Sequence, residues 1–190
     1  MDHLALLTYS EELLRQVVGE IAADEMDDET NCPPWTTRQL ASHALKNQLF
    51  WAGTVVGQDL MALDEAMAAV PYEGDLGPIA GEVTRLAVQL WHRDGIMTAE
   101  HTTPFGVLPG AVVVDFAIVD AAAHAWDISA SLGRPIDFSR EAVAALTDVF
   151  VLTCTEHTVE LGLIKPPTVP RDSATDTERL LATAGRTIAP

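Results

Sequence analysis

The sequence has little positive charge, few cysteines and few aromatic residues. It holds 11 lysines and arginines against 28 aspartates and glutamates in 190 residues, a formal net charge of −17. Such a surface repels phosphate backbones and anionic lipids, so we expect neither nucleic acid nor a membrane surface as a partner. The two cysteines, Cys32 and Cys154, are too few for a disulfide framework or a cysteine zinc site and indicate reduced thiols in a cytoplasmic protein.

Strand-forming patterns are scarce as well. Aromatic residues make up 6% of the chain, hydrophobic residues reach 48%, and no alternating apolar and polar run of strand length stands out. The N-terminal "MDHLALLTYSEELL" has an acidic residue where a secretory signal carries positive charge, so we expect no signal peptide. The length suits one hydrophobic core. We therefore predict an all-α chain that forms a single domain over residues 1–190.

Helical periodicity and end signals divide the chain. The predicted helices span residues 3–24, 36–56, 79–93, 110–133 and 139–162, with short helices within 59–70 and 177–186. Thr36 is the expected N-cap of the second, and Gly133 ends the fourth before Arg134-Pro135. Glycines and prolines in "DGIMTAEHTTPFGVLPG" exclude continued helix and predict a loop.

Polar residues interrupt the most apolar predicted helix at regular steps. In "DAAAHAWDISASLG", Asp120, His124 and Asp127 are four and three residues apart, so they share one helix face. The stretch from residue 111 to 132 approaches membrane-spanning length, but its three aspartates and one histidine would be costly in lipid. We therefore predict a buried helix, in which a carboxylate needs a partner.

The spacing of Asp120 and His124 is typical of one helix that presents two ligands to a metal. A third ligand is available in "RQLASHALKNQLFW", where His43 lies on a helical stripe that should face the core. Three ligands from two helices leave coordination positions open, as in catalytic sites. Asp127 is placed to accept a hydrogen bond from a ligand. Without metal, we expect Asp120 to lack a counter-charge and to take up a proton.

A simpler interpretation of the same residues is a buried hydrogen-bond network that needs no metal. The remaining histidines are expected on the surface or in loops, namely His3, His92, His101 and His157. Trp51 and Trp126 are expected in the core, and Cys154 as a small buried hydrophobe.

Two long motifs carry a resemblance to a known family. "PPWTTRQLASHALKNQLFWAG" and "DAAAHAWDISASLGRPIDF" resemble the helix-two and helix-four motifs of the mycothiol-dependent maleylpyruvate isomerase N-terminal domain family. That family is a branch of the DinB/YfiT-like superfamily of metal-binding four-helix bundles, found largely in actinobacteria. The tail "PPTVPRDSATDTERLLATAGR" resembles the ending of a single-domain actinobacterial subgroup. The resemblance implies a DinB-like four-helix bundle with an additional C-terminal helix.

The resemblance also implies a divalent metal, zinc or nickel, held by a histidine of the second helix and an acid-x-x-x-His pair of the fourth. These positions correspond to His43, Asp120 and His124. The family's acid is a glutamate, one methylene longer than Asp120, and the isomerase has a second domain for which this chain leaves no room.

The activity implied is therefore thiol-dependent transfer or isomerisation of a small electrophile, with mycothiol as co-substrate, and not maleylpyruvate isomerisation specifically. The alternative is a stress-related protein that binds a metal or small ligand without turnover. No residue can be assigned as a general base from the sequence. A homodimer is possible, but the sequence does not determine the oligomeric state.

Overall fold

The computed structural model describes residues 1–68 and 70–187 and divides the chain into two compact units. The larger unit runs from His3 to Ile136, and the smaller joins residues 1–2 to the part that begins at Asp137. The described chain is mostly helical with a small two-stranded sheet, which agrees with the predicted class. The predicted segment 59–70 includes residue 69, which lies outside the described part.

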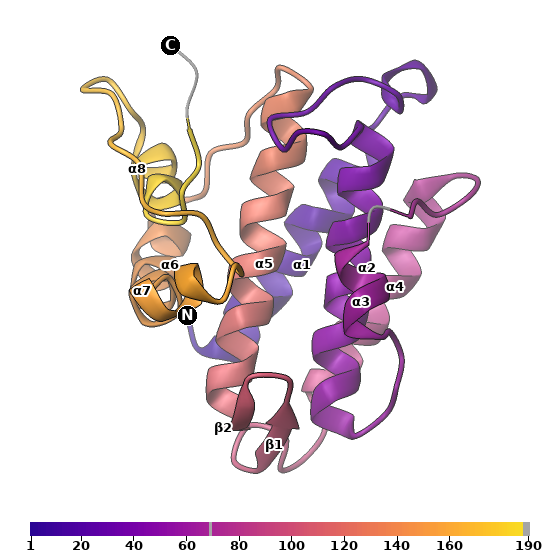
Figure 1. Ribbon diagram of the computed structural model, residues 1–190, viewed down its shortest axis with the longest axis vertical. Coiled ribbons are helices and arrows are strands. Elements are labelled where there is room, and N and C mark those ends of the chain that lie inside the picture. The colour runs from indigo at the N-terminus through magenta and orange to yellow at the C-terminus, as the bar shows by residue number, and fades with distance from the viewer. Residues whose placement is uncertain (69, 188–190) are drawn as a thin grey trace. The chain divides into compact units, whose positions relative to one another are not determined.

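Four long helices make the larger unit (Figure 1). They are α1 (His3–Gly19), α2 (Thr37–Val56), α4 (Leu76–Trp91) and α5 (Gly110–Ser131). Each packs against two of the others, because α1 and α2 both contact α4 and α5. Fully buried apolar side chains from all four helices meet between them, among them Leu14, Leu45, Leu76 and Ala121. In the described chain, no helix combines the length and hydropathy needed to cross a membrane.

Polar contacts at both ends show that α1 and α5 run in the same direction. His3 near the start of α1 lies 2.7 Å from Asp115 near the start of α5. Beyond the other ends of the two helices, Arg134 donates to the Glu25 carboxylate at 2.6 Å and to the Glu20 carbonyl at 3.4 Å. The two helices are therefore parallel neighbours.

The other two long helices run the opposite way. At the middle of both helices, Asn47 of α2 meets Asp120 of α5, whereas Asn31 before α2 meets Ser131 at the end of α5, so α2 and α5 are antiparallel. The Arg38 guanidinium donates to the Gly74 carbonyl just before α4, which places the starts of α2 and α4 together. Because α2 and α4 start at the same end of the bundle, the connection from the end of α2 runs back along the bundle to the start of α4. This connection contains the short helix α3 (Leu63–Met67), which packs on α2.

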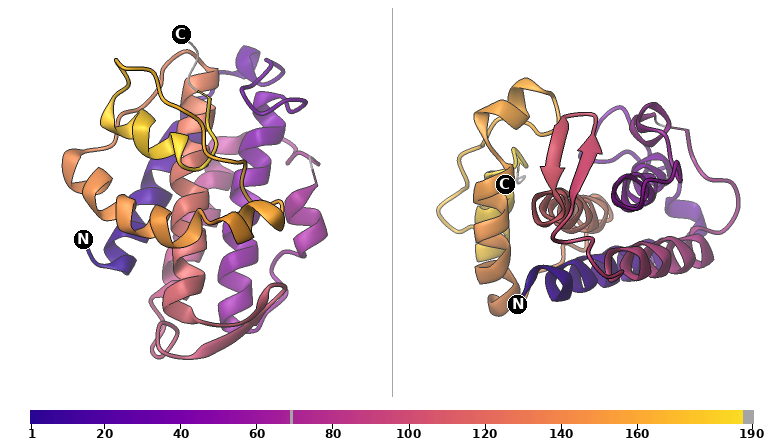
Figure 2. Two further views of the ribbon diagram at one scale, coloured as in Figure 1. Left: turned by 60° about the vertical axis from the view of Figure 1, so that its left-hand side comes forward. Right: turned by 90° about the horizontal axis from the view of Figure 1, so that it is seen from below.

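A β-hairpin replaces the loop that the sequence predicted before α5. The strands β1 (Glu100–Thr103) and β2 (Gly106–Pro109) pair antiparallel, with Thr103 opposite Gly106. β1 contacts α2 and β2 contacts α5, as the view from below shows (Figure 2). Gly106 has φ of 113°, a value that favours glycine, and so permits the tight turn. The prediction was wrong here because strands this short carry no periodic signal.

Two boundaries of the long helices also differ from the prediction by three residues or more. α1 ends at Gly19 and not near residue 24, and a separate 3₁₀ turn η1 (Ala23–Glu25) follows. α4 begins at Leu76, three residues early, because the Asp75 side chain caps the Gly77 amide. A proline in the first turn, where amides have no helical partner, does not prevent this start.

The smaller unit holds three helices within the described residues: α6 (Arg140–Thr153), α7 (Glu156–Glu160) and α8 (Asp176–Ala182). The sequence predicted one helix over 139–162, but it breaks at Cys154. There Thr155 becomes an N-cap whose hydroxyl accepts from the Thr158 amide. The predicted C-terminal helix is present as α8, capped by Thr175 and packed on α6.

Two glycine-to-alanine substitutions should change stability in opposite directions. At Gly110, a Cβ would lie 1.9 Å from the Ile96 carbonyl oxygen, so Gly110→Ala should cost roughly 1–3 kcal/mol. At Gly81, inside α4, a Cβ meets nothing within 4 Å, so Gly81→Ala should stabilise by roughly 0.5–1 kcal/mol. Urea denaturation followed by circular dichroism measures both. A neutral Gly110→Ala would contradict the close approach of the two backbones.

Candidate metal centre

The structure brings the three predicted ligands together where α2 faces α5. His43 lies on α2, and Asp120 and His124 lie one turn apart on α5. The His43 and His124 ring centroids are 5.1 Å apart, and the Nε2 atom of His124 is 3.5 Å from Oδ1 of Asp120. Both histidines are buried, and the Asp120 side chain retains 17% of its exposure. The predicted face is therefore an interior, nearly closed cluster.

Two amides of α2 hold the Asp120 carboxylate. Asn47 donates from Nδ2 to Oδ1 at 2.9 Å, and Gln48 donates from Nε2 to Oδ2 at 2.8 Å. Burial by itself would raise the pKa of Asp120, but the charge of His124, its hydrogen bond, the charge of His43 and the Asn47 hydrogen bond together lower that pKa. The expectation that a metal-free Asp120 takes up a proton was therefore wrong, because the protein supplies a counter-charge and two hydrogen-bond donors.

His124 lies between two carboxylates. Its Nε2 atom faces Asp120, and its Nδ1 atom is 3.2 Å from Oδ2 of Asp127, away from the ideal hydrogen-bond direction. Burial by itself would lower the pKa of His124, but Asp120 and then Asp127 raise it to about 9. In the metal-free protein this ring is an imidazolium at neutral pH.

His43 is held differently. Its Nδ1 atom donates to the Ala66 carbonyl of α3 at 2.7 Å, so the lone pair is on Nε2, where the Asn47 amide approaches to 3.2 Å. Burial lowers the pKa of His43, and the charge of His124 adds to this, to about 4. The Trp35 ring centroid is 4.4 Å from that of His43. His43 is therefore a neutral, oriented imidazole.

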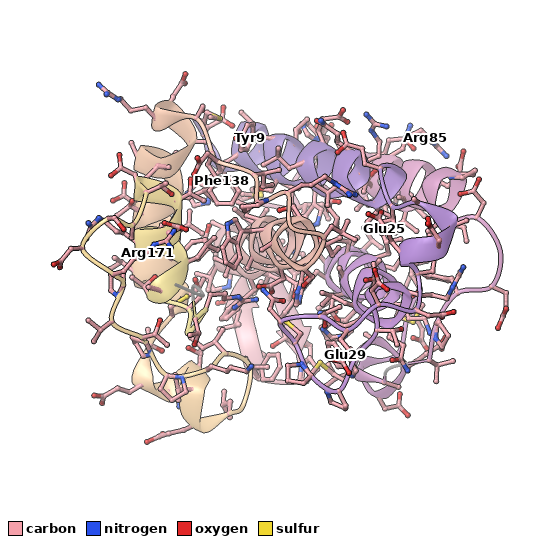
Figure 3. All side chains as sticks on the ribbon, turned by 90° about the horizontal axis from the view of Figure 1, so that it is seen from above. Tyr9, Glu25, Glu29, Arg85, Phe138 and Arg171 are labelled. Atoms are coloured by element: carbon pink, nitrogen blue, oxygen red, sulfur yellow. The ribbon has the colours of Figure 1, made fainter. Side chains whose placement is uncertain are left out.

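The connection between α1 and α2 supports this cluster from one end of the bundle. Its Asn31 backbone amide donates to the Ser131 hydroxyl at 3.0 Å, and its side-chain amide lies 3.5 Å from the Asp127 carboxylate. Figure 3 looks onto this end and labels Glu25 and Glu29 of the connection. Asp127 thus links the connection to the ring of His124.

Sequence reasoning missed two polar residues of this interior. Gln48 donates to Asp120, yet its Oε1 atom is buried without a hydrogen-bond partner in the described chain. Glu11 of α1 is 1% exposed with both carboxyl oxygens equally unpartnered, and burial, then the charge of Asp120, raises its pKa well above the usual value. Glu11 could have been found from the sequence, because it is a charged residue on the apolar stripe that includes Leu7, Leu14 and Val18.

Most of the other predicted placements agree with the structure, and those of His101 in β1 and of Cys154 differ in part. Trp51 and Trp126 are buried, and the side chains of His3, His92 and His157 are exposed. His101 is half-buried and bonds the Ile96 carbonyl through Nε2. Cys32 and Cys154 are half-buried thiols, so Cys154 is less enclosed than expected.

The chemical types of the three candidate ligands suit a divalent cation, but the distances between the side chains of the cluster are those of hydrogen bonds. Two imidazole nitrogens and a carboxylate oxygen are ligands of zinc and nickel, and each ring has an oxygen beside its Nδ1 atom, as metal-bound histidines usually do. Among the described residues, however, no group of three or more His, Cys, Asp or Glu side chains is close enough to hold an ion as it stands. The Asn47 amide lies between Asp120 and His43 and would have to turn aside.

Comparison with known proteins identifies relatives without a described function. The chain is 26% identical over 149 residues to two uncharacterized proteins of Mycobacterium tuberculosis, one from each of two strains. The alignment covers 74% of this chain and 73% of each relative. No family model matches the sequence, and no solved structure matches it.

The pKa values of His43 and His124 should differ widely in the metal-free protein. His43 should stay neutral down to about pH 4, and His124 should stay charged up to about pH 9, so at pH 7 only His124 carries a proton on both nitrogens. Because the pKa of His124 is raised above the unfolded value of about 6.5, its stabilising contribution is complete below that pH and is lost as pH rises through 9.

Nitrogen-15 NMR of the imidazole rings measures both values directly. Asp120→Asn should lower the pKa of His124 and weaken the loss of stability between pH 7 and 9. A His124 ring that is neutral at pH 7 in the unsubstituted, metal-free chain would contradict the charge assignment.

Proposed function

We propose that this protein binds one divalent metal, zinc or nickel, through His43, Asp120 and His124 and uses it in thiol-dependent chemistry on a small electrophile. The observation that supports this most is the orientation of the two rings. An oxygen lies at the Nδ1 atom of each, the Ala66 carbonyl for His43 and Asp127 for His124. The Nε2 atom of His124 faces the Asp120 carboxylate, and the Nε2 atom of His43 shares the Asn47 amide with that carboxylate, so a cation would be bound between the three groups.

The helix arrangement supports a DinB-like four-helix bundle with additional C-terminal helices. Two parallel pairs of helices, α1 with α5 and α2 with α4, are antiparallel to one another, and the long connection containing α3 joins the second pair. Metal sites in helical bundles are built from inward-facing side chains of neighbouring helices, as these three residues are.

A divalent cation held there supplies a positive charge that favours the thiolate form of a bound thiol at neutral pH. The chain's own residues prepare this site. Asp120 is ionised, and His43 already presents a lone pair at Nε2, whereas His124 must release its proton from Nε2. The Trp35 ring beside His43 and the burial of both histidines exclude water from that side of the cluster.

By resemblance, the thiol is mycothiol, and the mycobacterial source of the two relatives agrees with the actinobacterial character of that family. The cytoplasmic location is proposed from the N-terminal sequence and the two cysteines. Turnover would require a small electrophile as the second substrate. A protein that binds metal or a small ligand without turnover is the alternative within the same site.

A metal-free hydrogen-bond network is a second candidate, favoured by one contact. Asn47 joins Asp120 to His43 through a single amide nitrogen, an arrangement that satisfies both groups without an ion. Such a network would serve to fix the register of α2 against α5.

Metal titration distinguishes the two. Protein purified without chelator should bind about one zinc or nickel ion per chain, and binding should release about one proton because His124 is charged beforehand. Loss of a residue that hydrogen-bonds a metal ligand lowers metal affinity roughly 10–100-fold, and Asp127→Asn should fall within that range. His43→Ala and His124→Ala each remove a ligand and should lower the metal affinity by more than that. Calorimetry in two buffers of different ionisation enthalpy gives affinity and proton count together.

His92→Ala is the matched control, since His92 is exposed on the far end of α4 and bonds only its own helix backbone among the contacts seen. Its affinity should equal that of the unsubstituted chain. Equal binding by His124→Ala would rule out the ligand assignment and leave the hydrogen-bond network.

Thiol binding is tested on cobalt-loaded protein. If the bound cation keeps an open position, mycothiol should produce an intense sulfur-to-cobalt charge-transfer band in the near ultraviolet, more strongly than glutathione or cysteine. Thiol consumption with epoxides, alkyl halides and maleylpyruvate, compared with His43→Ala, then measures turnover. A band without turnover would favour the binding protein, and no band with any thiol would exclude the thiol hypothesis.

A further inference from the structure

A second feature of the larger unit is a pocket of about 380 Å³. It lies against the C-terminal half of α2, the helix that also carries His43. Its walls come from the end of α2, the segment that follows, and the β-hairpin. His43, Asn47, Phe50 and Thr54 share one face of α2, and the last two line the pocket. Phe50 is seven residues from His43, about 10 Å along the helix axis. The volume is in the range of small-molecule sites.

One segment belongs to both the pocket and the metal centre. Met61, Ala62 and Leu63 form a wall of the pocket, and Ala66, one turn later in α3, accepts the hydrogen bond that orients His43. A molecule that moves the pocket wall therefore displaces the carbonyl that holds His43.

Gly53 allows this segment to lie against α2. A Cβ at Gly53 would be 2.6 Å from the Gln58 carbonyl oxygen, and the Gln58 amide donates back to the Gly53 carbonyl at 3.0 Å. A side chain there would push the segment outward and open the pocket wall. The sequence thus builds the pocket with a glycine at the point of closest approach.

The lining selects by charge and by apolar surface. Its apolar surface comes from aromatic, aliphatic, proline and thioether side chains: Phe50, Leu63, Pro104 and Met61. The lining residues include one carboxylate, Asp59, and no lysine or arginine. Thr54 donates its hydroxyl proton to the Phe50 carbonyl at 2.9 Å, so toward a ligand its oxygen acts as an acceptor, whereas the side-chain amide of Gln58 can also donate.

We propose that this pocket binds the substrate of the adjacent centre, and that this substrate is a small, partly apolar molecule with no negative charge. The assignment to a substrate rests on the proposed function, whereas the binding itself does not. A dicarboxylate such as maleylpyruvate is excluded because the pocket offers it no cation, and the net charge of −17 adds long-range repulsion.

Three six-carbon probes of equal length test the selection: hexylamine, hexanol and hexanoate, each titrated into metal-free protein and followed by amide NMR. Hexylamine and hexanol should shift the signals of Thr54, Gln58 and Thr103, with hexanoate binding at least roughly threefold more weakly than either. Asp59→Asn should reduce the advantage of hexylamine over hexanol. Equal or tighter binding of hexanoate would overturn the proposal.

Ala62→Trp should fill the pocket and abolish these shifts, whereas Ala23→Trp, on the exposed turn after α1, should leave them unchanged. Thr54→Val removes one acceptor with little change of shape and should weaken hexanol and hexylamine binding if Ala62→Trp fails to fold. Shifts that persist in folded Ala62→Trp, or in Thr54→Val at full affinity, would overturn the proposal.

The same samples separate this pocket from the metal centre. Hexylamine should move the ring signals of His43 through the Ala66 carbonyl, and Thr54→Val, which lies outside the segment that carries Ala66, should keep the metal affinity of the unsubstituted chain. Loss of metal binding together with weaker probe binding in folded Thr54→Val would overturn a separate pocket. Probe binding by a chain that binds no metal would overturn the proposed function and the assignment to its substrate, and would leave a binding pocket only.

Discussion

The carboxylate of Asp120 is the group on which the interior of the larger unit depends. An ionised carboxylate in a nearly closed position is tolerated only when its charge is paired and its oxygens accept hydrogen bonds. Here two amides of α2 and one imidazolium of α5 meet that need. Because Asn47 and Gln48 must both reach Asp120, the register of α2 against α5 is fixed, and His43 is thereby placed opposite His124.

Each histidine is in turn held by a part of the chain outside the four long helices. The short helix α3 supplies the carbonyl for His43, and the connection before α2 contacts Asp127, which lies beside His124. The two rings, 5.1 Å apart, differ in charge, because burial and then the charge of His124 keep His43 neutral, whereas Asp120 and then Asp127 keep His124 protonated. A cation that enters must replace one proton and displace one amide, so its affinity depends on how readily Asn47 turns and His124 deprotonates.

Much of the site could be predicted from sequence because helix spacing alone puts Asp120, His124 and Asp127 on one face. His43 could be added because it lies on the apolar stripe of α2. Gln48 and Glu11 were missed because a polar residue in a helix is usually solvated, and only the packing of α1, α2 and α5 shows that both are buried. The contribution of Ala66 is a backbone carbonyl, which no residue type reveals.

Local periodicity and capping signals were enough to predict the helical class, the cap of α2 at Thr36, the core positions of Trp51 and Trp126 and the helix face that carries two of the three candidate ligands. Tertiary structure decided the rest. The direction of the helices, the return of α3 onto His43, the hairpin against α2 and α5, and the pairing that keeps Asp120 ionised all depend on contacts between residues far apart in the chain. Side-chain burial and pKa values follow from those contacts, because the free energy of a charge depends on its surroundings and not on its neighbours in sequence.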